Sequence, residues 1–113
     1  MMTIVTRVTL RSEGVHPWDR VMHARLAAAR EKPGWVSAQL LKGVDRPLER
    51  AIVGVWNSKE DWAAWHHDET FRATREQLAG VEDCAAESTW FEVVENAEWS
   101  ARSVLARSGH VHA

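Results

Sequence analysis

Three tryptophans, Trp56, Trp62 and Trp65, lie close together near the middle of the chain and are followed directly by His66. The whole sequence holds seven tryptophans and no tyrosine in 113 residues. An indole ring buries a large apolar area yet keeps one N–H donor that needs a partner. Indoles gathered at one place therefore suit the wall of a pocket for a flat, partly polar molecule. The alternative is that they fill a small hydrophobic core.

His66 adds a group that can exchange a proton, because imidazole has an ordinary pKa of about 6.5. If this segment is helical, His66 shares a face with Trp62 and Trp65, whereas the adjacent His67 does not. We interpret His66 either as a general base beside the pocket or as a residue that caps the end of a broken helix.

Two further candidates lie on the apolar stripe of an earlier segment. Arg25 either lays its stem along the core and reaches solvent, or places a cation beside the pocket. In the second case it would stabilise an enolate or select an acidic substrate. Met22, one turn earlier, is interpreted as pocket wall or core.

Composition excludes several function classes. Acidic and basic residues nearly balance, 16 against 14, and no block of Lys and Arg stands out, so a nucleic-acid or anionic-membrane footprint is absent. The N-terminus has no secretory leader pattern, and no apolar run approaches the length that spans a membrane. Cys84 is the single cysteine, and no Cys/His spacing resembles a metal site. We expect a cytoplasmic protein that acts on something small or on another protein.

The hydrophobic periodicity predicts four strands and two helices in the order β-α-β-β-α-β, which is the arrangement of a ferredoxin-like sandwich of the α+β class. The first helix begins near Pro17 and ends before Pro33-Gly34. Ser58 with Asp61 opens the second helix, a break near His67 follows, and Asp68 caps a further segment that buries Phe71. The strands are expected over residues 3–10, 35–42, 51–56 and 89–94.

Residues 1–95 are expected to form one domain, and residues 96–113 a polar tail that is mobile or lies on a partner subunit. The predicted strands carry apolar or small residues on both faces. Because two helices cover only one face of a sheet, we expect a homodimer in which two sheets face each other. The expected division places Ile52, Gly54 and Trp56 opposite Ala51, Val53 and Val55, and Val36, Ala38 and Leu40 opposite Trp35, Gln39 and Leu41.

Five motifs follow one another along these elements: Pro33-Gly34-Trp35, Gln39-Leu40-Leu41, Trp56, Trp62-Ala63-Ala64-Trp65-His66 and Phe71-Arg72. Together with the order of the elements, they resemble the antibiotic biosynthesis monooxygenase domain family, within the dimeric α+β barrel superfamily. The resemblance covers about residues 3–94. It implies homodimers with a pocket between sheet and helices in each subunit. Members that oxidise aromatic polyketide anthrones need no metal or organic cofactor, since the deprotonated substrate passes an electron directly to oxygen.

The resemblance implies a cofactor-independent monooxygenase that oxidises an electron-rich, anthrone-like or polyketide-like aromatic with molecular oxygen. Trp56 and Thr6 then take the catalytic positions, although Thr6 stands where this family carries an asparagine. That departure favours an alternative, a non-catalytic dimeric barrel that binds a hydrophobic ligand. The substrate-binding residues are expected to be Trp65, His66, Met22, Arg25 and Phe71.

A third reading is a heme-binding or heme-degrading protein. Trp65 matches the distal tryptophan of the heme-degrading branch. The place of the proximal histidine is held by Thr74 or Arg75, however, so the resemblance disfavours this reading.

Overall fold

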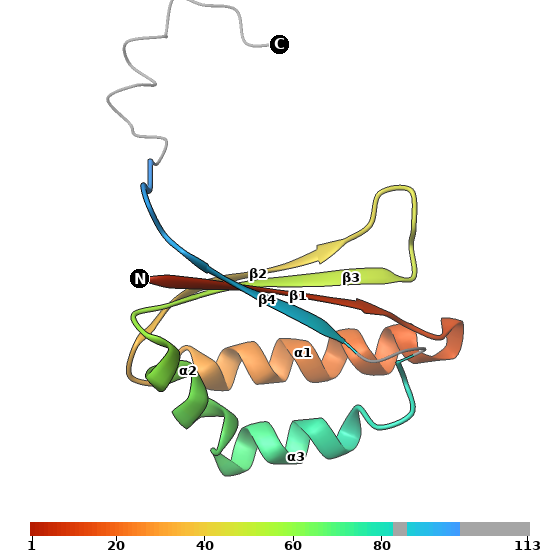
Figure 1. The fold of residues 1–113 in the computed structure, drawn as a ribbon. Helices are drawn as coiled ribbons and strands as arrows, with labels where there is room; N and C mark the ends of the chain where they lie inside the picture. The colour runs from red at the N-terminus through yellow and green to blue at the C-terminus, as the bar shows by residue number, and fades with distance from the viewer. Residues whose placement is uncertain (83–85, 98–113) are drawn as a thin grey trace, which may run out of the picture.

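A four-stranded antiparallel sheet is covered on one face by three helices (Figure 1). The computed structural model describes residues 1–82 and 86–97. The order confirms the predicted ferredoxin-like α+β fold, with the second helix split in two. The elements are β1 (Met2–Thr9), the 3-10 turn η1 (Ser12–Gly14), α1 (Val15–Ala29), β2 (Trp35–Lys42), β3 (Glu49–Trp56), α2 (Lys59–His66), α3 (Glu69–Gln77) and β4 (Glu87–Glu92).

The sheet has the strand order β2-β3-β1-β4, so β1 and β3 are central. β2 and β3 pair antiparallel, which confirms the predicted hairpin. β4 lies two residues earlier than expected, over 87–92 rather than 89–94. Glu92 pairs with Met2, where β1 begins, and one further backbone hydrogen bond, from the Val93 N–H to the Met1 carbonyl at 3.1 Å, follows that pair.

The turn between α1 and β2 uses the predicted Pro33-Gly34 pair. Gly34 has φ +86°, in the left-handed region that favours glycine. A Cβ at Gly34 would also overlap the side chain of Asp61 on α2. Glycine therefore lets the chain turn and pass close to α2 at the same place.

Trp35 lies on a different face of the sheet from the one expected. A register shift between Trp35 and Ser37 interrupts the ladder of β2 against β3. The additional residue at this bulge reverses the alternation, so Trp35 lies with Ala38 on the helix side. The predicted opposition of Trp35 to Ala38 was wrong for this reason.

The break in the second helical region is confirmed at His67 and Asp68. The Ser58 Oγ accepts a hydrogen bond from the Asp61 N–H at 3.2 Å and caps α2. The Asp68 Oδ1 accepts one from the Thr70 N–H at 2.8 Å and caps α3. Lys32 forms an ion pair with Asp68 at 2.8 Å, which fixes the end of α1 to the start of α3.

The core consists of two hydrophobic clusters joined by α1. One contains Met22 and the other Ala29, so both clusters use the same helical stripe. The buried members of the first are Val8, Leu10, Trp18, Met22 and Leu78. Those of the second are Ala29, Trp56, Trp65 and Phe71.

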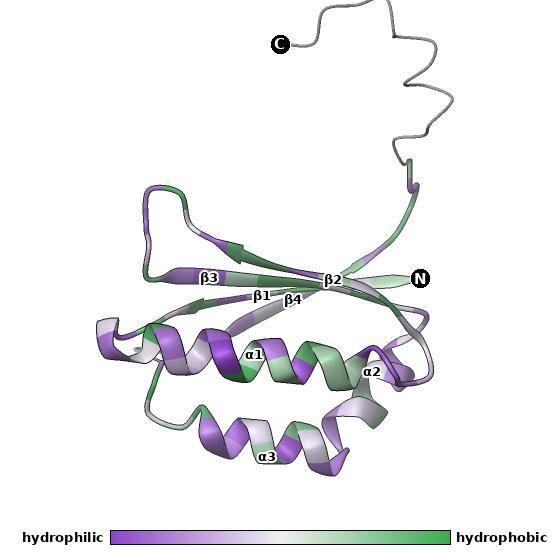
Figure 2. Ribbon diagram, turned by 180° about the vertical axis from the view of Figure 1, so that it is seen from behind, coloured by the Kyte–Doolittle hydropathy of each residue, from purple (hydrophilic) through white to green (hydrophobic). Residues whose placement is uncertain are grey.

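No described helix covers the other face of the sheet (Figure 1). Its central residues include Val5 and Val53, which pair with each other. Hydrophobic colour runs along the middle of β3 (Figure 2). Val36, Leu41 and Phe91 are exposed large hydrophobic residues on the flanking strands. No described helix is long and apolar enough to cross a membrane. Most of the predicted tail, residues 98–113, lies outside the described residues.

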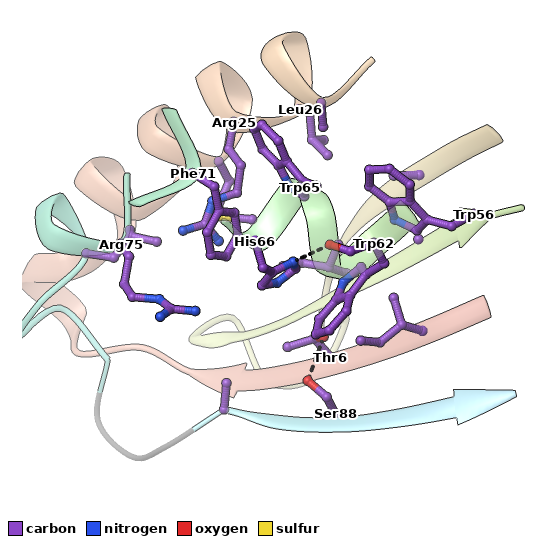
Figure 3. Close-up of a pocket in the computed structure, with 18 of the residues that line it drawn as sticks. Thr6, Arg25, Leu26, Trp56, Trp62, Trp65, His66, Phe71, Arg75 and Ser88 are labelled. Atoms are coloured by element: carbon purple, nitrogen blue, oxygen red, sulfur yellow. Dashed lines mark hydrogen bonds between the residues drawn. The ribbon is translucent and has the colours of Figure 1, made fainter. Parts of the chain in front are cut away.

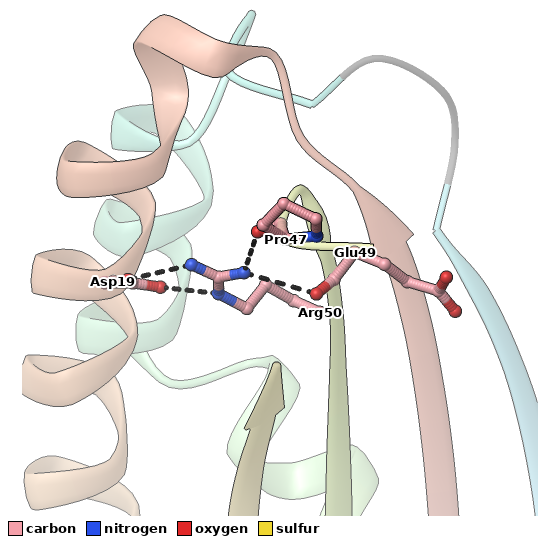
Figure 4. A network of polar contacts seen from close by, with 4 residues as sticks. All are labelled: Asp19, Pro47, Glu49 and Arg50. Carbon is pink, nitrogen blue, oxygen red and sulfur yellow. Dashed lines mark hydrogen bonds and ion pairs between the residues drawn. The ribbon is translucent and has the colours of Figure 1, made fainter. Parts of the chain in front are cut away.

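A buried arginine on β3, which the sequence pattern does not reveal, holds the first turns of α1 to the sheet (Figure 4). Arg50 is only 5% exposed. Its Nε and Nη2 donate to the two carboxylate oxygens of Asp19 at 3.0 and 3.2 Å. Its Nη1 donates to the carbonyls of Pro47 and Glu49 at 2.6 and 3.2 Å. Each of the three guanidinium nitrogens therefore has a partner despite the burial of Arg50.

We expect Asp19→Ala to lower the free energy of unfolding by about 1–3 kcal/mol, because it leaves two buried charged donors without acceptors. The loss stays below that of a fully buried pair because the Asp19 side chain is 47% exposed and water can replace it. Urea denaturation measures the change. Arg46→Ala is the control, since its ion pair with Glu49 is long, 3.6 Å, and 81% exposed on the arginine side. Equal stability of the two variants would contradict the role of Asp19.

Candidate functional site

A cavity of about 690 Å³ lies between the sheet and the helices, and its wall gathers every site residue that the sequence predicts (Figure 3). Its size lies within the range of small-molecule sites, about 300–1,000 Å³. The functional roles of these residues stay predictions, but their proximity is a property of the fold. The predicted residues on the wall are Thr6, Met22, Arg25, Trp56, Trp65, His66 and Phe71.

One end of the cavity is aromatic. Trp35 meets Trp56 edge to face, with ring centroids 5.5 Å apart and planes at 88°. Trp65 meets Phe71 in a similar way, at 5.5 Å and 72°. Trp62 completes this end of the wall. Flat indole faces and edges at several angles provide stacking surface for a planar ring system.

The Trp56 indole N–H lies over Gly54, a second position where glycine matters. A Cβ built at Gly54 would lie 3.7 Å from the Trp56 Nε1. Because Gly54 carries no side chain, that indole edge is left open. Among the described residues no buried side-chain nitrogen lacks a partner, and no hydrogen bond joins Trp56 Nε1 to them. The N–H of Trp56, a residue of the cavity wall, therefore has no acceptor in residues 1–82 and 86–97 and can donate to a ligand.

Thr6 and Ser88 form a polar strip on the sheet side of the cavity. They pair across β1 and β4, and their hydroxyl oxygens are 2.9 Å apart. Each hydroxyl has one donor and can accept, so the pair donates one proton internally and keeps one free. The sequence prediction missed Ser88, because the fourth strand was expected to begin at Thr89.

His66 is stacked between Trp62 and Phe71, with centroid distances of 3.7 and 3.9 Å. Its Nδ1 lies 2.9 Å from the Trp62 carbonyl oxygen (Figure 3). A carbonyl only accepts, so Nδ1 carries the hydrogen. In the neutral ring Nε2 then holds a lone pair. His66 is the last residue of α2 and bonds a carbonyl one turn back, while the C-cap position itself is His67, so both interpretations of His66 stay predictions.

Burial lowers the pKa of His66 to about 4. The positive charges of Arg25 and Arg75 and the neighbouring His67 lower the pKa further, while the hydrogen bond to the Trp62 carbonyl opposes them. The ring is therefore neutral near pH 7. A neutral imidazole with a fixed tautomer and a lone pair on Nε2 is a proton acceptor.

The other end of the cavity carries two arginines, and Phe71 lies between them and the indoles. The guanidinium carbon of Arg25 lies 4.3 Å from the ring centroid, and that of Arg75 lies 5.1 Å from it. Arg25 Nε donates to the Thr74 hydroxyl at 2.9 Å, and that hydroxyl donates to the Phe71 carbonyl at 2.6 Å. Burial lowers the pKa of Arg25 to about 10, with Arg75 lowering it further and Glu82 opposing.

Several wall residues were not among the predicted site residues. The sequence did not place Trp35 at the site, because the bulge in β2 reverses the alternation of side chains. Trp62 shares the helical face of Trp65, and this spacing could have placed it at the site. Arg75 follows Phe71 by four residues, which is also a visible helical spacing. Glu82 belongs to a loop and gives no sequence signal. In residues 1–82 and 86–97, no group of three or more His, Cys, Asp and Glu side chains could hold a metal ion.

The sequence matches the family model described as antibiotic biosynthesis monooxygenase over residues 1–77. No protein with a curated description matches it. Three solved structures show the same fold at low identity. SnoaB from Streptomyces nogalater, described as a cofactor-independent oxygenase, has a TM-score of 0.74 at 19% identity, covering 84% of this chain and 94% of SnoaB.

The other two structures are described without an activity. Rv0793 from Mycobacterium tuberculosis has a TM-score of 0.78 at 14% identity and covers 86% of this chain and 98% of its own. A conserved protein from Methanosarcina mazei Go1 has a TM-score of 0.76 at 11% identity and covers 80% and 89%. At these identities the likeness establishes the fold alone.

The buried environment of His66 predicts a pH dependence of stability. The folded pKa of about 4 lies below the unfolded value of 6.5, so the unfolded chain binds a proton more readily between these values. The contribution of His66 is therefore complete above about pH 6.5 and is lost as the pH falls toward 4. NMR titration should show His66 protonating near pH 4 from the Nδ1–H tautomer.

His66→Gln should reduce the slope of unfolding free energy between pH 6.5 and 4. His23→Gln, at an exposed position of α1, is the control and should leave that slope unchanged. A His66 ring that titrates near its ordinary pKa would contradict the stacking between Trp62 and Phe71.

Proposed function

The chain belongs to the antibiotic biosynthesis monooxygenase family, and on this premise we propose that it is a cofactor-independent monooxygenase that oxidises an electron-rich, anthrone-like aromatic with molecular oxygen. The observation that carries the proposal is the pairing of a neutral imidazole acceptor with an open indole donor on one aromatic-walled cavity. Proton removal and stabilisation of the resulting oxyanion are the two tasks that this chemistry asks of a protein. The description of SnoaB as a cofactor-independent oxygenase supports the same reaction class.

The reaction begins with proton transfer. His66 Nε2 accepts a proton from the acidic carbon of the substrate, and the electron pair of the C–H bond becomes an enolate. The stacked positions of Trp62 and Phe71 hold the imidazole plane, and the Trp62 carbonyl holds its tautomer. The proton acceptor is therefore fixed before substrate binds, which reduces reorganisation during the step.

Oxidation follows on the enolate. It passes one electron to O2, giving superoxide and a substrate radical, and these combine in a new C–O bond. The peroxide takes the proton back. The second proton of the same carbon then leaves, its C–H electron pair forms the C=O bond as the O–O bond breaks, and the departing hydroxide takes up that proton as water. One CH2 group becomes a carbonyl, one oxygen atom enters the product and the other leaves as water. The electron balance closes with the substrate as the only reductant.

Trp56 and Thr6 are proposed to stabilise the enolate. The Trp56 N–H is a free donor at the cavity surface, and the Thr6–Ser88 hydroxyl pair retains one proton to donate. A donor fixed in a cavity shielded from water stabilises developing negative charge more than it would in bulk solvent. Trp65 supplies ring surface for the substrate, and Met22 on α1 lines the cavity.

One observation favours a second function, the binding of a hydrophobic ligand without turnover. The Thr6 hydroxyl is already bonded to Ser88, whereas the family pattern has an asparagine amide at this position. Oxygen consumption separates the two functions. If the protein only binds its ligand, an anthrone should quench the tryptophan fluorescence of the protein and no oxygen should be consumed.

The oxygenase proposal predicts stoichiometric oxygen uptake when the protein meets an anthrone in metal-free buffer. Trp56→Phe keeps an aromatic ring but removes the N–H, so its rate should fall on the order of a hundredfold. Trp90→Phe is the control, because Trp90 packs edge to face on Trp62, at 5.0 Å, lies under the Lys59 ammonium and is outside the cavity wall. A Trp56→Phe rate equal to that of the wild type would reduce Trp56 to a packing residue.

We also propose that the protein works as a homodimer joined through the open face of the sheet. That face carries Val5, Val53 and Val55 at its centre and the exposed Leu41 and Phe91 near its edges. A contiguous apolar surface over several strands is larger than soluble monomers usually expose. A second copy related by a twofold axis can cover it, since such an interface needs only self-complementarity.

Val53→Asp should split or unfold the dimer, because it places a charge at the centre of the proposed interface. Sedimentation at micromolar concentration measures the assembly. Val44→Asp makes the same substitution in a loop where valine is 96% exposed, and it should sediment like the wild type. A compact, stable wild-type monomer would refute the dimer.

A further inference from the structure

We infer that the preferred substrate is an acidic aromatic, a fused ring system with a carboxylate that binds between Arg25 and Arg75. This inference rests on the proposed function and names its substrate class. The wall of the cavity is asymmetric, with indoles at one end and both guanidinium groups at the other (Figure 3). A ligand that is apolar at one end and anionic at the other fits both ends at once.

Arg25 is held in position before any ligand arrives. Its Nε donates to the Thr74 hydroxyl at 2.9 Å, and its guanidinium lies over the Phe71 ring at 4.3 Å. The hydroxyl of Thr74 is itself fixed by the Phe71 carbonyl at 2.6 Å. The Nη groups make no hydrogen bond within residues 1–82 and 86–97. They are therefore donors that remain available to a carboxylate in a defined geometry.

Among the described residues, the positive charges beside Phe71 have no ion-pair partner. No carboxylate of the described residues lies within ion-pair distance of Arg25 or Arg75, in contrast to Arg50, which Asp19 neutralises. Glu82 also lines the cavity, and its negative charge raises the pKa of Arg25. This effect is smaller than the lowering of that pKa by burial and by the charge of Arg75. The guanidinium groups of Arg25 and Arg75 carry like charges and repel each other. A cation–π contact with Phe71 requires only one of the two. A bound carboxylate removes this repulsion.

The test compares two probes that match in shape and differ in charge, anthraquinone-2-carboxylate and anthraquinone-2-carboxamide. Neither is a substrate for oxidation at an acidic carbon, so binding is measured without turnover through quenching of the pocket tryptophans. The wild type should bind the carboxylate at least about tenfold more tightly than the amide, as for a charge-assisted hydrogen-bonded pair. Added salt should weaken carboxylate binding and leave amide binding unchanged.

Arg75→Gln and Arg25→Gln should each lose most of this preference while retaining amide affinity. Arg75 is exposed, so its variant is expected to fold even if the Arg25 variant does not. Arg72→Gln, on the same helix but outside the cavity wall, is the matched control and should keep the preference. Equal binding of the two probes, binding of neither, or a preference that survives in both variants would overturn the inference.

The outcome is separable from that of the oxygenase proposal. Carboxylate preference without oxygen uptake on any anthrone would support the anion site and refute the oxidation. Oxygen uptake on neutral anthrones without carboxylate preference would refute the anion site and support the oxidation.

Discussion

The site depends on the packing of Trp65 and Phe71 against Trp56 and Ala29. These four side chains come from α2, α3, β3 and α1, and their contact is the only buried cluster among the described residues that joins all four elements. Trp65 and Phe71 flank the break at His67, and their edge-to-face contact fixes the angle between α2 and α3. That angle brings His66 onto Phe71. If the aromatic contact were lost, His66, its stacking partners and the arginines would no longer face the same cavity.

The open cavity lowers the stability of the fold, and packing elsewhere in the domain offsets this loss. Side chains that line an open space lose packing partners on one side. The chain compensates on both flanks of the cavity. Trp18, Leu10 and Met22 form a fully buried cluster at one end of α1, and Arg50 ties the same end of the helix to β3 through Asp19. α1 is therefore anchored on both sides of the cavity. Arg25 lies between the two clusters, where a polar residue disturbs neither.

The sequence predicts the fold and most of the wall, because both follow from periodicity and local capping. Ser58 and Asp68 mark their helix starts, and the stripe of α1 carries Met22 and Arg25 to the cavity. It does not predict Trp35, because a bulge reverses alternation without a sequence signal. Nor does it reveal the protonation of His66. That property depends on Trp62, Phe71 and two arginines, which the chain brings together only after the helix break has set their directions.

The arginines and the histidine are linked through one electrostatic environment. The positive charges of Arg25 and Arg75 contribute to the low pKa of His66, so they keep the base neutral but also weaken it. A carboxylate bound between the two guanidinium groups would cancel this contribution, and the proton affinity of Nε2 would rise. A base is most effective when its pKa approaches the working pH. An acidic aromatic would therefore raise the basicity of His66, whereas a neutral aromatic of the same shape would leave His66 as weak a proton acceptor as before.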